Sequence, residues 1–189
     1  MKKSVGNKIL LSIIIPYHKK NKFFHSTIKS IYNQTFKNYE VILIYDDNDY
    51  GEINFVKNQL KKIKNRKLII NKKILGPGLS RNIGIKYAKG KLIAFCDADD
   101  TWDKNKLSEQ IKFMTKNNLK FSHSSYNIID YNGKKTGQFK IKEKLNYSDL
   151  LKSCDIGLST VIVEKKILNT SKFCNLKTKE DYYLWLKIV

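Results

Sequence analysis

Two groups of aspartates, each directly after a predicted buried strand, have residue types and spacing suited to binding a metal ion and phosphate. The first is the run Asp97-Ala98-Asp99-Asp100, which follows the apolar segment Lys91–Cys96. The second is the pair Asp46-Asp47, which follows Glu40–Tyr45. Two carboxylates at positions i and i+2 of an extended turn can face a hard divalent cation together with phosphate oxygens. The first run therefore indicates a metal–diphosphate site, although aspartates after a strand also cap helices and occupy solvated turns.

The segment from Gly78 to Gly84 (GLSRNIG) has the pattern of a helix start that can bind phosphate. The first turn of a helix offers free backbone N–H groups and partial positive charge, and Arg81 adds a side chain that makes charge-assisted hydrogen bonds. A capped helix with a surface arginine has the same pattern. The pair Glu180-Asp181 opens the last predicted helix, where acidic residues complement the helix dipole whether or not they take part in catalysis.

Strand-type and helix-type segments alternate through the first half of the chain and must position these groups. Ile9–Ile15 is a continuous apolar run closed by Pro16, which predicts a strand buried on both faces. The helical segments have apolar residues at helical spacing. The later segments, in chain order, are a helix over Asn21–Gln34, a strand over Glu40–Tyr45, a helix over Ile53–Ile63, a strand over Lys67–Ile70, a helix over Leu79–Ala88 and a strand over Lys91–Cys96.

This alternation predicts an α/β fold with a doubly wound, mostly parallel sheet and helices on both faces. Because such sheets bind ligands beyond the carboxyl ends of their strands, we expect the two aspartate groups to converge on one crevice. The pattern becomes less regular after Asp103, which can cap a helix over Lys104–Lys116. It then predicts strands within Lys120–Ile129 and Thr136–Ile141 around a turn at Asn132-Gly133, a short helix over Ser148–Lys152, a strand over Ser159–Val163 and a final helix from Glu180 to Val189.

Length and composition favour one folded domain. The 189 residues are 41% hydrophobic with only two prolines, and a chain of this length can bury a full core without disulfides. Three cysteines without paired spacing argue against a disulfide framework and a structural zinc site. Met1-Lys2-Lys3 leads into no signal-peptide pattern and no apolar run reaches membrane-spanning length, so we expect a cytoplasmic protein. Because no stop signal follows the last helix, we expect the chain to be truncated at its C-terminal end.

The net charge of +20 is compatible with two kinds of anionic partner, nucleic acid and membranes. Only Arg66 and Arg81 are arginines, whereas base recognition favours the arginine fork. The lysine-, asparagine- and isoleucine-rich composition is also typical of A/T-rich codon usage, which raises the charge without selecting a partner. We therefore expect no nucleic-acid partner, and we favour peripheral contact with an anionic membrane.

Taken in order, these motifs resemble the inverting glycosyltransferases of family 2, which have the GT-A fold. The resemblance is carried by the segments SIIIPYH, SIYNQTFKNYEVILIYDDN and GLSRNIGIKYAKGKLIAFCDADD, and by a late KED before a helix that contains tryptophan. It is dense from Leu11 to Asp103 and resumes at Glu180. It implies a single GT-A domain over residues 1–189, with a nucleotide-binding half at about 9–103 and an acceptor-side half at about 104–189.

The resemblance also implies the roles of individual residues. Asp181 matches the general base. Asp99 and Asp97 match the DxD pair that binds a divalent metal, Mn²⁺ or Mg²⁺, with Asp99 as the more direct ligand. The residues that match the nucleotide-sugar site are Pro16, Tyr17, His18, Asp47, Arg81, Asp97, Ala98 and Asp99. The Tyr17-His18-Lys19 sequence departs from the Thr-Tyr-Asn that many relatives have after the proline, which leaves the nucleobase open.

The implied reaction moves a sugar from a nucleotide-diphosphate donor, with UDP-sugar favoured, to a hydroxyl of a glycan or lipid-linked acceptor in cell-surface polysaccharide synthesis. A metal ion and Arg81 would stabilise charge on the leaving diphosphate, and a carboxylate base would take the proton of the acceptor hydroxyl. Two alternatives remain at this stage. One is a nucleotidyltransferase of similar topology, although no glycine follows Pro16 as its phosphate loop requires. The other is a lysine-rich module that binds nucleic acid or membranes without catalysis.

Overall fold

Strand β1 (Leu11–Tyr17) lies in the interior of a six-stranded sheet, and both of its faces are buried. The computed structural model describes residues 9–188. Residues 1–8, on which the expectation about a signal peptide rests, and Val189, the predicted last residue of the final helix, lie outside the described residues. Ile13 and Ile15 pack on one side of the sheet and Ile14 on the other, as the continuous apolar run predicts.

The sheet has the strand order β3-β2-β1-β4-β8-β5. The first four strands in this order are parallel, β8 runs antiparallel to β4, and β5 runs antiparallel to β8. The remaining strands are β2 (Tyr39–Tyr45), β3 (Arg66–Ile70), β4 (Leu92–Phe95), β5 (Phe121–Ser122) and β8 (Ile162–Glu164). The predicted mostly parallel, doubly wound sheet is therefore confirmed.

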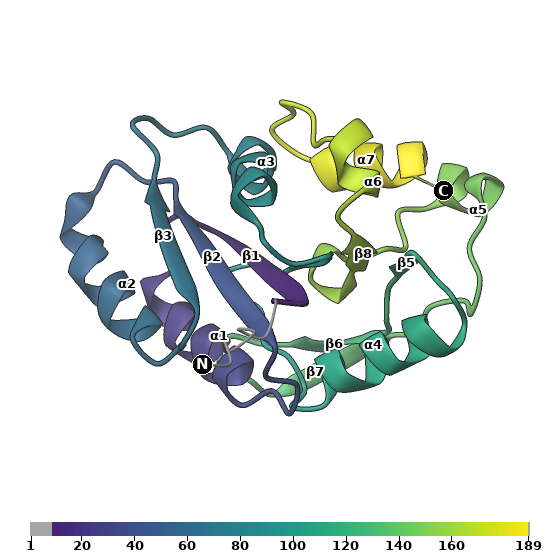
Figure 1. Ribbon diagram of the computed structural model, residues 1–189, viewed down its shortest axis with the longest axis horizontal. Helices are drawn as coiled ribbons and strands as arrows, with labels where there is room; N and C mark the ends of the chain where they lie inside the picture. The colour runs from purple at the N-terminus through teal and green to yellow at the C-terminus, as the bar shows by residue number, and fades with distance from the viewer. Residues whose placement is uncertain (1–8, 189) are drawn as a thin grey trace, which may run out of the picture.

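Helices cover both faces of this sheet (Figure 1). One layer contains α1 (Asn21–Tyr32), α2 (Ile53–Leu60) and α4 (Lys106–Lys116). The other layer contains α3 (Pro77–Tyr87), α5 (Tyr147–Lys152), α6 (Ile167–Thr170) and α7 (Glu180–Ile188). Helix α3 lies directly on β1 and β2 because Gly84 has no side chain: a Cβ atom there would be 2.6 Å from Ile14 Cγ2.

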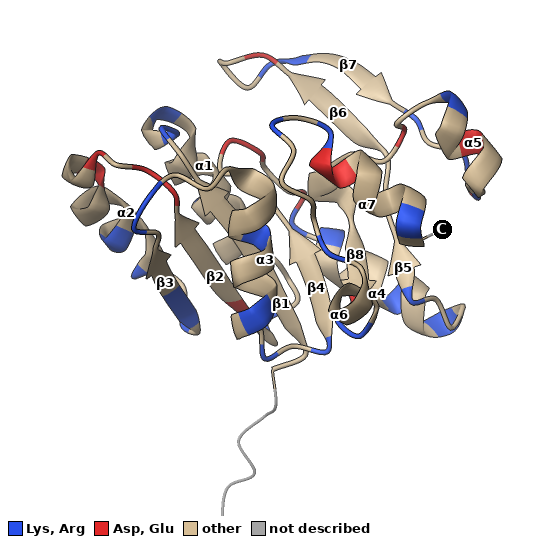
Figure 2. Ribbon diagram, turned by 90° about the horizontal axis from the view of Figure 1, so that it is seen from above, with Lys and Arg blue, Asp and Glu red and all other residues tan. Residues whose placement is uncertain are grey.

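A separate hairpin of β6 (Tyr126–Ile129) and β7 (Lys135–Phe139) follows β5 and forms its own two-stranded sheet. Figure 2 shows the hairpin beyond the carboxyl ends of the parallel strands, at the same end as the acidic loops. Short 3₁₀ turns occupy Tyr50–Glu52 and Leu158–Thr160. The predicted irregular region after the DxD segment is thus present, and its strands are shorter than predicted.

Several predicted boundaries are wrong by a few residues for identifiable reasons. Pro16 lies within β1, because its missing N–H faces the side of β4, which ends at Phe95. Helix α4 begins at Lys106, since Asp103 accepts a hydrogen bond from the Asn105 N–H in a turn that precedes the helix. The predicted strand from Ser159 begins three residues late, after a 3₁₀ turn, and the four-residue helix α6 has no counterpart in the prediction.

Candidate functional site

Asp46, at the carboxyl end of β2, fixes the loop that leads into α3. Its buried carboxylate accepts hydrogen bonds from the N–H groups of Leu75 and Gly76 at 2.8 and 2.7 Å, and from Asn71 Nδ2 at 2.7 Å. Gly76 caps α3 with a φ of +85°, a left-handed conformation that glycine adopts without strain. Asp46 therefore has a structural role, and it holds the start of α3 beside the strand ends.

Asp47 is held as a carboxylate by two backbone donors. It accepts hydrogen bonds of 3.0 Å from the N–H groups of Lys19 and Asp49, and His18 Nδ1 lies 3.5 Å from its Oδ2 atom. Burial acts to raise the pKa of Asp47, but the Asp49 N–H, the nearby His18 and the Lys19 N–H outweigh it and hold the pKa below its usual value. Asp47 is therefore ionised at neutral pH and points into the loop after β1.

Arg81 forms a fork between two carboxylates that are far apart in the sequence. Its Nη2 atom lies 2.7 Å from Asp97 Oδ1, and its Nη1 atom lies 2.6 Å from Glu180 Oε1. The Arg81 side chain is 4% exposed, and its Nε atom has no hydrogen-bond partner. Arg81 therefore links the first half of α3, the loop after β4 and the start of α7, and in this state it positions Asp97.

Side chains of other elements hold the Asp97–Asp100 loop by hydrogen bonds. The Asp97 N–H donates to Ser159 Oγ at 3.0 Å, and Ser159 in turn donates to Asp100 Oδ2 at 2.5 Å. Thr27 of α1 donates to the Ala98 carbonyl at 2.9 Å. Burial raises the pKa of Asp100, against the hydrogen bond from Ser159. The side chains of Asp97 and Asp99 are each about a third exposed, and Asp100, whose Oδ2 atom is bound by Ser159, is exposed as well.

Asp97 and Asp99 fit the divalent metal that the family resemblance implies. Both are hard carboxylate donors, and Asp99 already holds a cation, since Lys20 Nζ lies 2.6 Å from its Oδ2 atom. Within residues 9–188, no group of three or more histidine, cysteine, aspartate or glutamate side chains is placed to hold a metal. Magnesium sites with one or two carboxylates take their remaining ligands from water and substrate phosphates. Asp97 and Asp99 therefore fit a site whose remaining ligands are water or, when a donor is bound, diphosphate oxygens.

Asp181 lies in the first turn of α7, partly exposed, next to buried Glu180. Burial raises the pKa of the Asp181 carboxyl, and the Glu180 carboxylate adds to this effect, while the Tyr182 N–H and Arg81 oppose it. A raised carboxyl pKa suits a group that must accept a proton near neutral pH.

The structure separates the other predicted site residues into core and rim positions. The Tyr17 ring is buried, stacks on Tyr45 at 5.4 Å between ring centroids, and donates its hydroxyl to Glu52. Ala98 is also buried. Pro16 is half-buried, and His18 is about half exposed and donates a hydrogen bond from Nδ1 to the Asp46 carbonyl at 2.9 Å. The side chains of Tyr17 and Ala98 thus support the loops, and His18 lies at the rim.

Three functional contacts have no counterpart in the sequence prediction: Arg81 with Glu180, Ser159 with the DxD loop, and Lys20 with Asp99. The interpretation of Glu180 as a residue that complements the helix dipole is incomplete, because Glu180 also forms a buried ion pair. One signal was available at Gly78, where a Cβ atom would lie 2.9 Å from both the Cys174 carbonyl oxygen and Glu180 Cγ. A glycine at this position indicates that another segment packs closely against the helix, but the sequence does not identify that segment.

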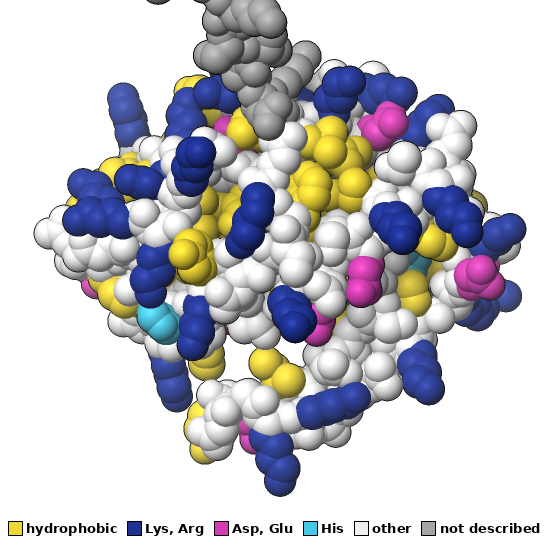
Figure 3. All heavy atoms as spheres, turned by 60° about the horizontal axis from the view of Figure 1, so that its bottom comes forward, with side chains coloured by type: hydrophobic (Ala, Val, Ile, Leu, Met, Phe, Trp, Pro, Cys, Tyr) yellow, Lys and Arg dark blue, Asp and Glu magenta, His cyan; other side chains and the backbone are white. Residues whose placement is uncertain are grey.

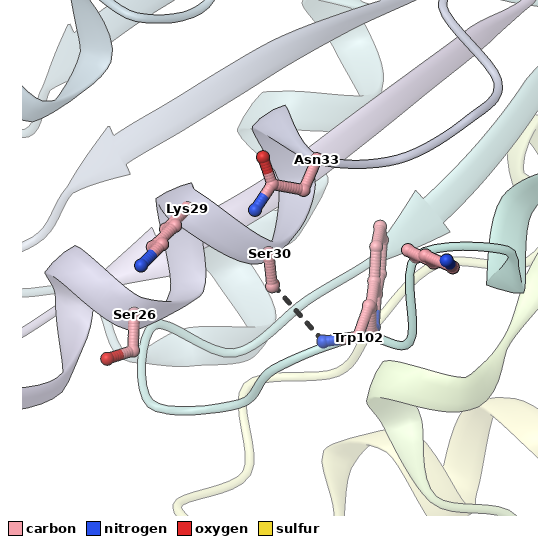
Figure 4. A pocket seen from close by; sticks show the side chains of 6 residues that line it. Ser26, Lys29, Ser30, Asn33 and Trp102 are labelled. Carbon is pink, nitrogen blue, oxygen red and sulfur yellow. Dashed lines mark hydrogen bonds between the residues drawn. The ribbon is translucent and has the colours of Figure 1, made fainter.

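A hollow elsewhere on the surface does not belong to this group of residues. It has a volume of about 270 Å³ and is lined by α1 and the segment around Trp102, whose N–H donates to Ser30 Oγ (Figure 4). Lys29 and Asn33 lie on its rim and none of the aspartates discussed above lines it. The candidate site is therefore the open acidic edge of the sheet.

A parallel sheet that continues into antiparallel strands, with acidic loops at the carboxyl ends, matches the GT-A fold. The chain superimposes on the solved structure of Staphylococcus aureus TarS 1-349 in complex with UDP, with a TM-score of 0.76 and 24% sequence identity. The match covers 93% of this chain and 53% of the TarS chain, so this chain spans about half the length of that structure.

Residues 12–174 match the family described as glycosyl transferase family 2. The chain belongs to this family. It is 39% identical over 181 residues to the Escherichia coli UDP-Glc:alpha-D-GlcNAc-diphosphoundecaprenol beta-1,3-glucosyltransferase WfgD, covering 95% of this chain and 70% of that protein. It is 29% identical over 184 residues to the putative teichuronic acid biosynthesis glycosyltransferase TuaG of Bacillus subtilis, covering 73% of that protein. The matched region includes every predicted site residue except Asp181, which lies seven positions beyond it.

Proposed function

We propose that this domain transfers a sugar from a UDP-sugar to a hydroxyl of a lipid-linked glycan acceptor, with inversion at the anomeric carbon. The observation that carries the proposal is the Arg81 fork, which ties the DxD loop to the helix that bears Asp181. The names of WfgD and of a second Escherichia coli relative, WfaP, which is 38% identical, support both the donor and the acceptor class, since both describe UDP-Glc and alpha-D-GlcNAc-diphosphoundecaprenol.

For the donor, we propose that the nucleoside lies against Asp47 and the diphosphate lies over Asp97 and Asp99. The ionised Asp47 carboxylate can accept hydrogen bonds from ribose hydroxyls or from N–H groups of the base. A Mn²⁺ or Mg²⁺ ion held by Asp99 and Asp97 would supply positive charge to the diphosphate as it leaves. Arg81 keeps Asp97 in place by a charge-assisted hydrogen bond of 2.7 Å. It therefore positions one of the two carboxylates that would hold the metal ion beside the diphosphate.

For the acceptor, we propose Asp181 as the general base. The acceptor oxygen forms a bond to the anomeric carbon while the bond from that carbon to the diphosphate oxygen breaks, and the electron pair leaves with UDP. Asp181 takes the proton of the attacking hydroxyl. Attack from the face opposite the diphosphate inverts the anomeric carbon. The raised pKa of Asp181 supports this role.

The direct test of donor choice is calorimetric titration of the purified chain with UDP, GDP and their sugar conjugates, with Mn²⁺ and with a chelator. We expect UDP to bind most tightly and to need the metal. Asp99→Asn tests the site without a large change in shape, and Asp130→Asn, at a half-buried position in the turn after β6, is its matched control. Binding of UDP that is equal in wild type and Asp99→Asn would overturn the proposed donor site.

We also propose that the protein works at the cytoplasmic face of a membrane, where it meets its lipid-linked acceptor through electrostatic attraction. Within residues 9–188, no helix is both long and apolar enough to cross a bilayer. Figure 3 shows lysine and arginine side chains spread over one face of the molecule. Co-sedimentation with anionic liposomes should therefore fall as salt rises, because charges are screened beyond about 8 Å at physiological ionic strength. Equal binding to neutral and anionic liposomes would contradict this attraction.

A further inference from the structure

The turn between β1 and α1 contacts both acidic groups of the site. Lys19 has a φ of +48°, a conformation that is uncommon for a residue with a side chain, and its N–H donates to Asp47 Oδ2 at 3.0 Å. The next residue, Lys20, is the N-cap of α1, and its Nζ atom lies 2.6 Å from Asp99 Oδ2. The strained turn thus places the backbone of Lys19 against Asp47, which follows β2, and the side chain of Lys20 against Asp99, in the loop after β4.

The two carboxylates of the DxD pair have cationic partners of very different kinds. Asp97 is bound by Arg81, whose side chain is 4% exposed and is held at its other end by Glu180. Asp99 is bound by Lys20, whose side chain is 42% exposed. Exposed lysine–carboxylate pairs contribute little to stability, whereas a buried guanidinium fork is costly to break. Asp99 is therefore the carboxylate of the pair that can exchange its cation.

We propose that Lys20 is a diphosphate-binding residue that is held on Asp99 as a counter-ion until Asp99 takes up a divalent cation. Two cations on one carboxylate repel each other, so Lys20 must leave Asp99 when that exchange occurs. Its flexible four-carbon stem keeps the ammonium group within reach of the same loop, where a diphosphate supplies new anionic partners. This inference rests on the proposed function for the identity of the anion, and it adds a residue that the sequence analysis did not assign.

Substitution of Lys20 with methionine should change the affinities for Mn²⁺ and for UDP in opposite directions. In Lys20→Met, Mn²⁺ alone should bind about two- to fivefold more tightly than in wild type, because the metal no longer displaces a resident ammonium. With saturating Mn²⁺, UDP should bind about tenfold more weakly, because one charge-assisted contact to the diphosphate is lost. Mn²⁺ binding is measured by the loss of its free electron paramagnetic resonance signal, and UDP binding by calorimetry.

Lys22→Met is the matched control, because it removes the same charge two residues further along α1. Lys22 Nζ lies over the Tyr131 ring at 4.9 Å from the ring centroid. Lys22→Met should change both affinities less than twofold. A second control combines Lys20→Met with Asp99→Asn: in the Asp99→Asn background, the Lys20 substitution should no longer tighten Mn²⁺ binding.

Mn²⁺ affinity that is the same in Lys20→Met, Lys22→Met and wild type would overturn the counter-ion role, and so would undetectable Mn²⁺ binding in all three. Unchanged UDP affinity in Lys20→Met would overturn the diphosphate role. Failure of the proposed function gives a different result, since wild type would then bind no UDP while the Mn²⁺ comparison still reports on the exchange at Asp99.

Discussion

Arg81 and Glu180, 99 residues apart in the chain, form a buried ion pair with 2.6 Å between Nη1 and Oε1. The other arm of the same guanidinium binds Asp97. One side chain thus connects the loop that carries Asp97 and Asp99 with the helix that carries Asp181. Glu180 thus anchors the start of α7, where the next residue, Asp181, is the proposed base.

Replacing Glu180 with alanine should destabilise the fold by about 3 kcal/mol, because removal of one member of a buried pair leaves the other charge uncompensated. The free energy of unfolding measured with urea reports the change. Glu143→Ala, at an exposed position, is the control and should change stability by less than about 0.5 kcal/mol. A Glu180→Ala variant as stable as Glu143→Ala would show that the pair contributes no net stability.

The alternation of strands and helices could be predicted because it follows from local patterns of apolar residues. β1 and β2 are buried on both faces, and their continuous apolar runs reflect that directly. The contacts of Arg81 with Glu180 and of Lys20 with Asp99 could not be predicted in this way, since the two partners are 99 and 79 residues apart in the chain. Only the topology of the sheet brings those charges together, and nothing in the spacing of Lys20 identifies Asp99.

The stability of the protein should depend on pH through Asp181. Its pKa is raised in the folded protein, so the folded state favours the protonated form. The ionised carboxyl therefore costs stability above its folded pKa, and this cost disappears as pH falls below about 4, the ordinary pKa of an aspartate. Asp181→Asn should accordingly be more stable than wild type at pH 7 and equal to it near pH 3, as measured by urea unfolding at both pH values. A constant difference between the two proteins would contradict the raised pKa.

Removing the Ser159 hydroxyl should loosen the DxD loop. Ser159→Ala leaves the Asp97 N–H and the Asp100 carboxylate without their partner, which should cost about 1 to 3 kcal/mol of stability. The affinity for Mn²⁺ with UDP should also fall, since the Asp97 backbone is no longer held by Ser159 and only the Arg81 contact still positions its carboxylate. Ser148→Ala, at an exposed position of α5, is the control. If Ser159→Ala keeps both stability and affinity, Arg81 alone fixes the loop.

The central claim, that this domain is a glycosyltransferase in which Asp99 serves the donor and Asp181 the acceptor, is tested most directly by comparing two variants in one transfer assay. The measurement is the rate of sugar transfer from UDP-glucose to a lipid-diphosphate-linked GlcNAc, together with UDP affinity by calorimetry. Asp181→Asn should keep wild-type UDP affinity and lose at least about 10²-fold in transfer, the usual contribution of a general base. Asp99→Asn should lose UDP affinity as well. Undiminished transfer by Asp181→Asn would contradict the account.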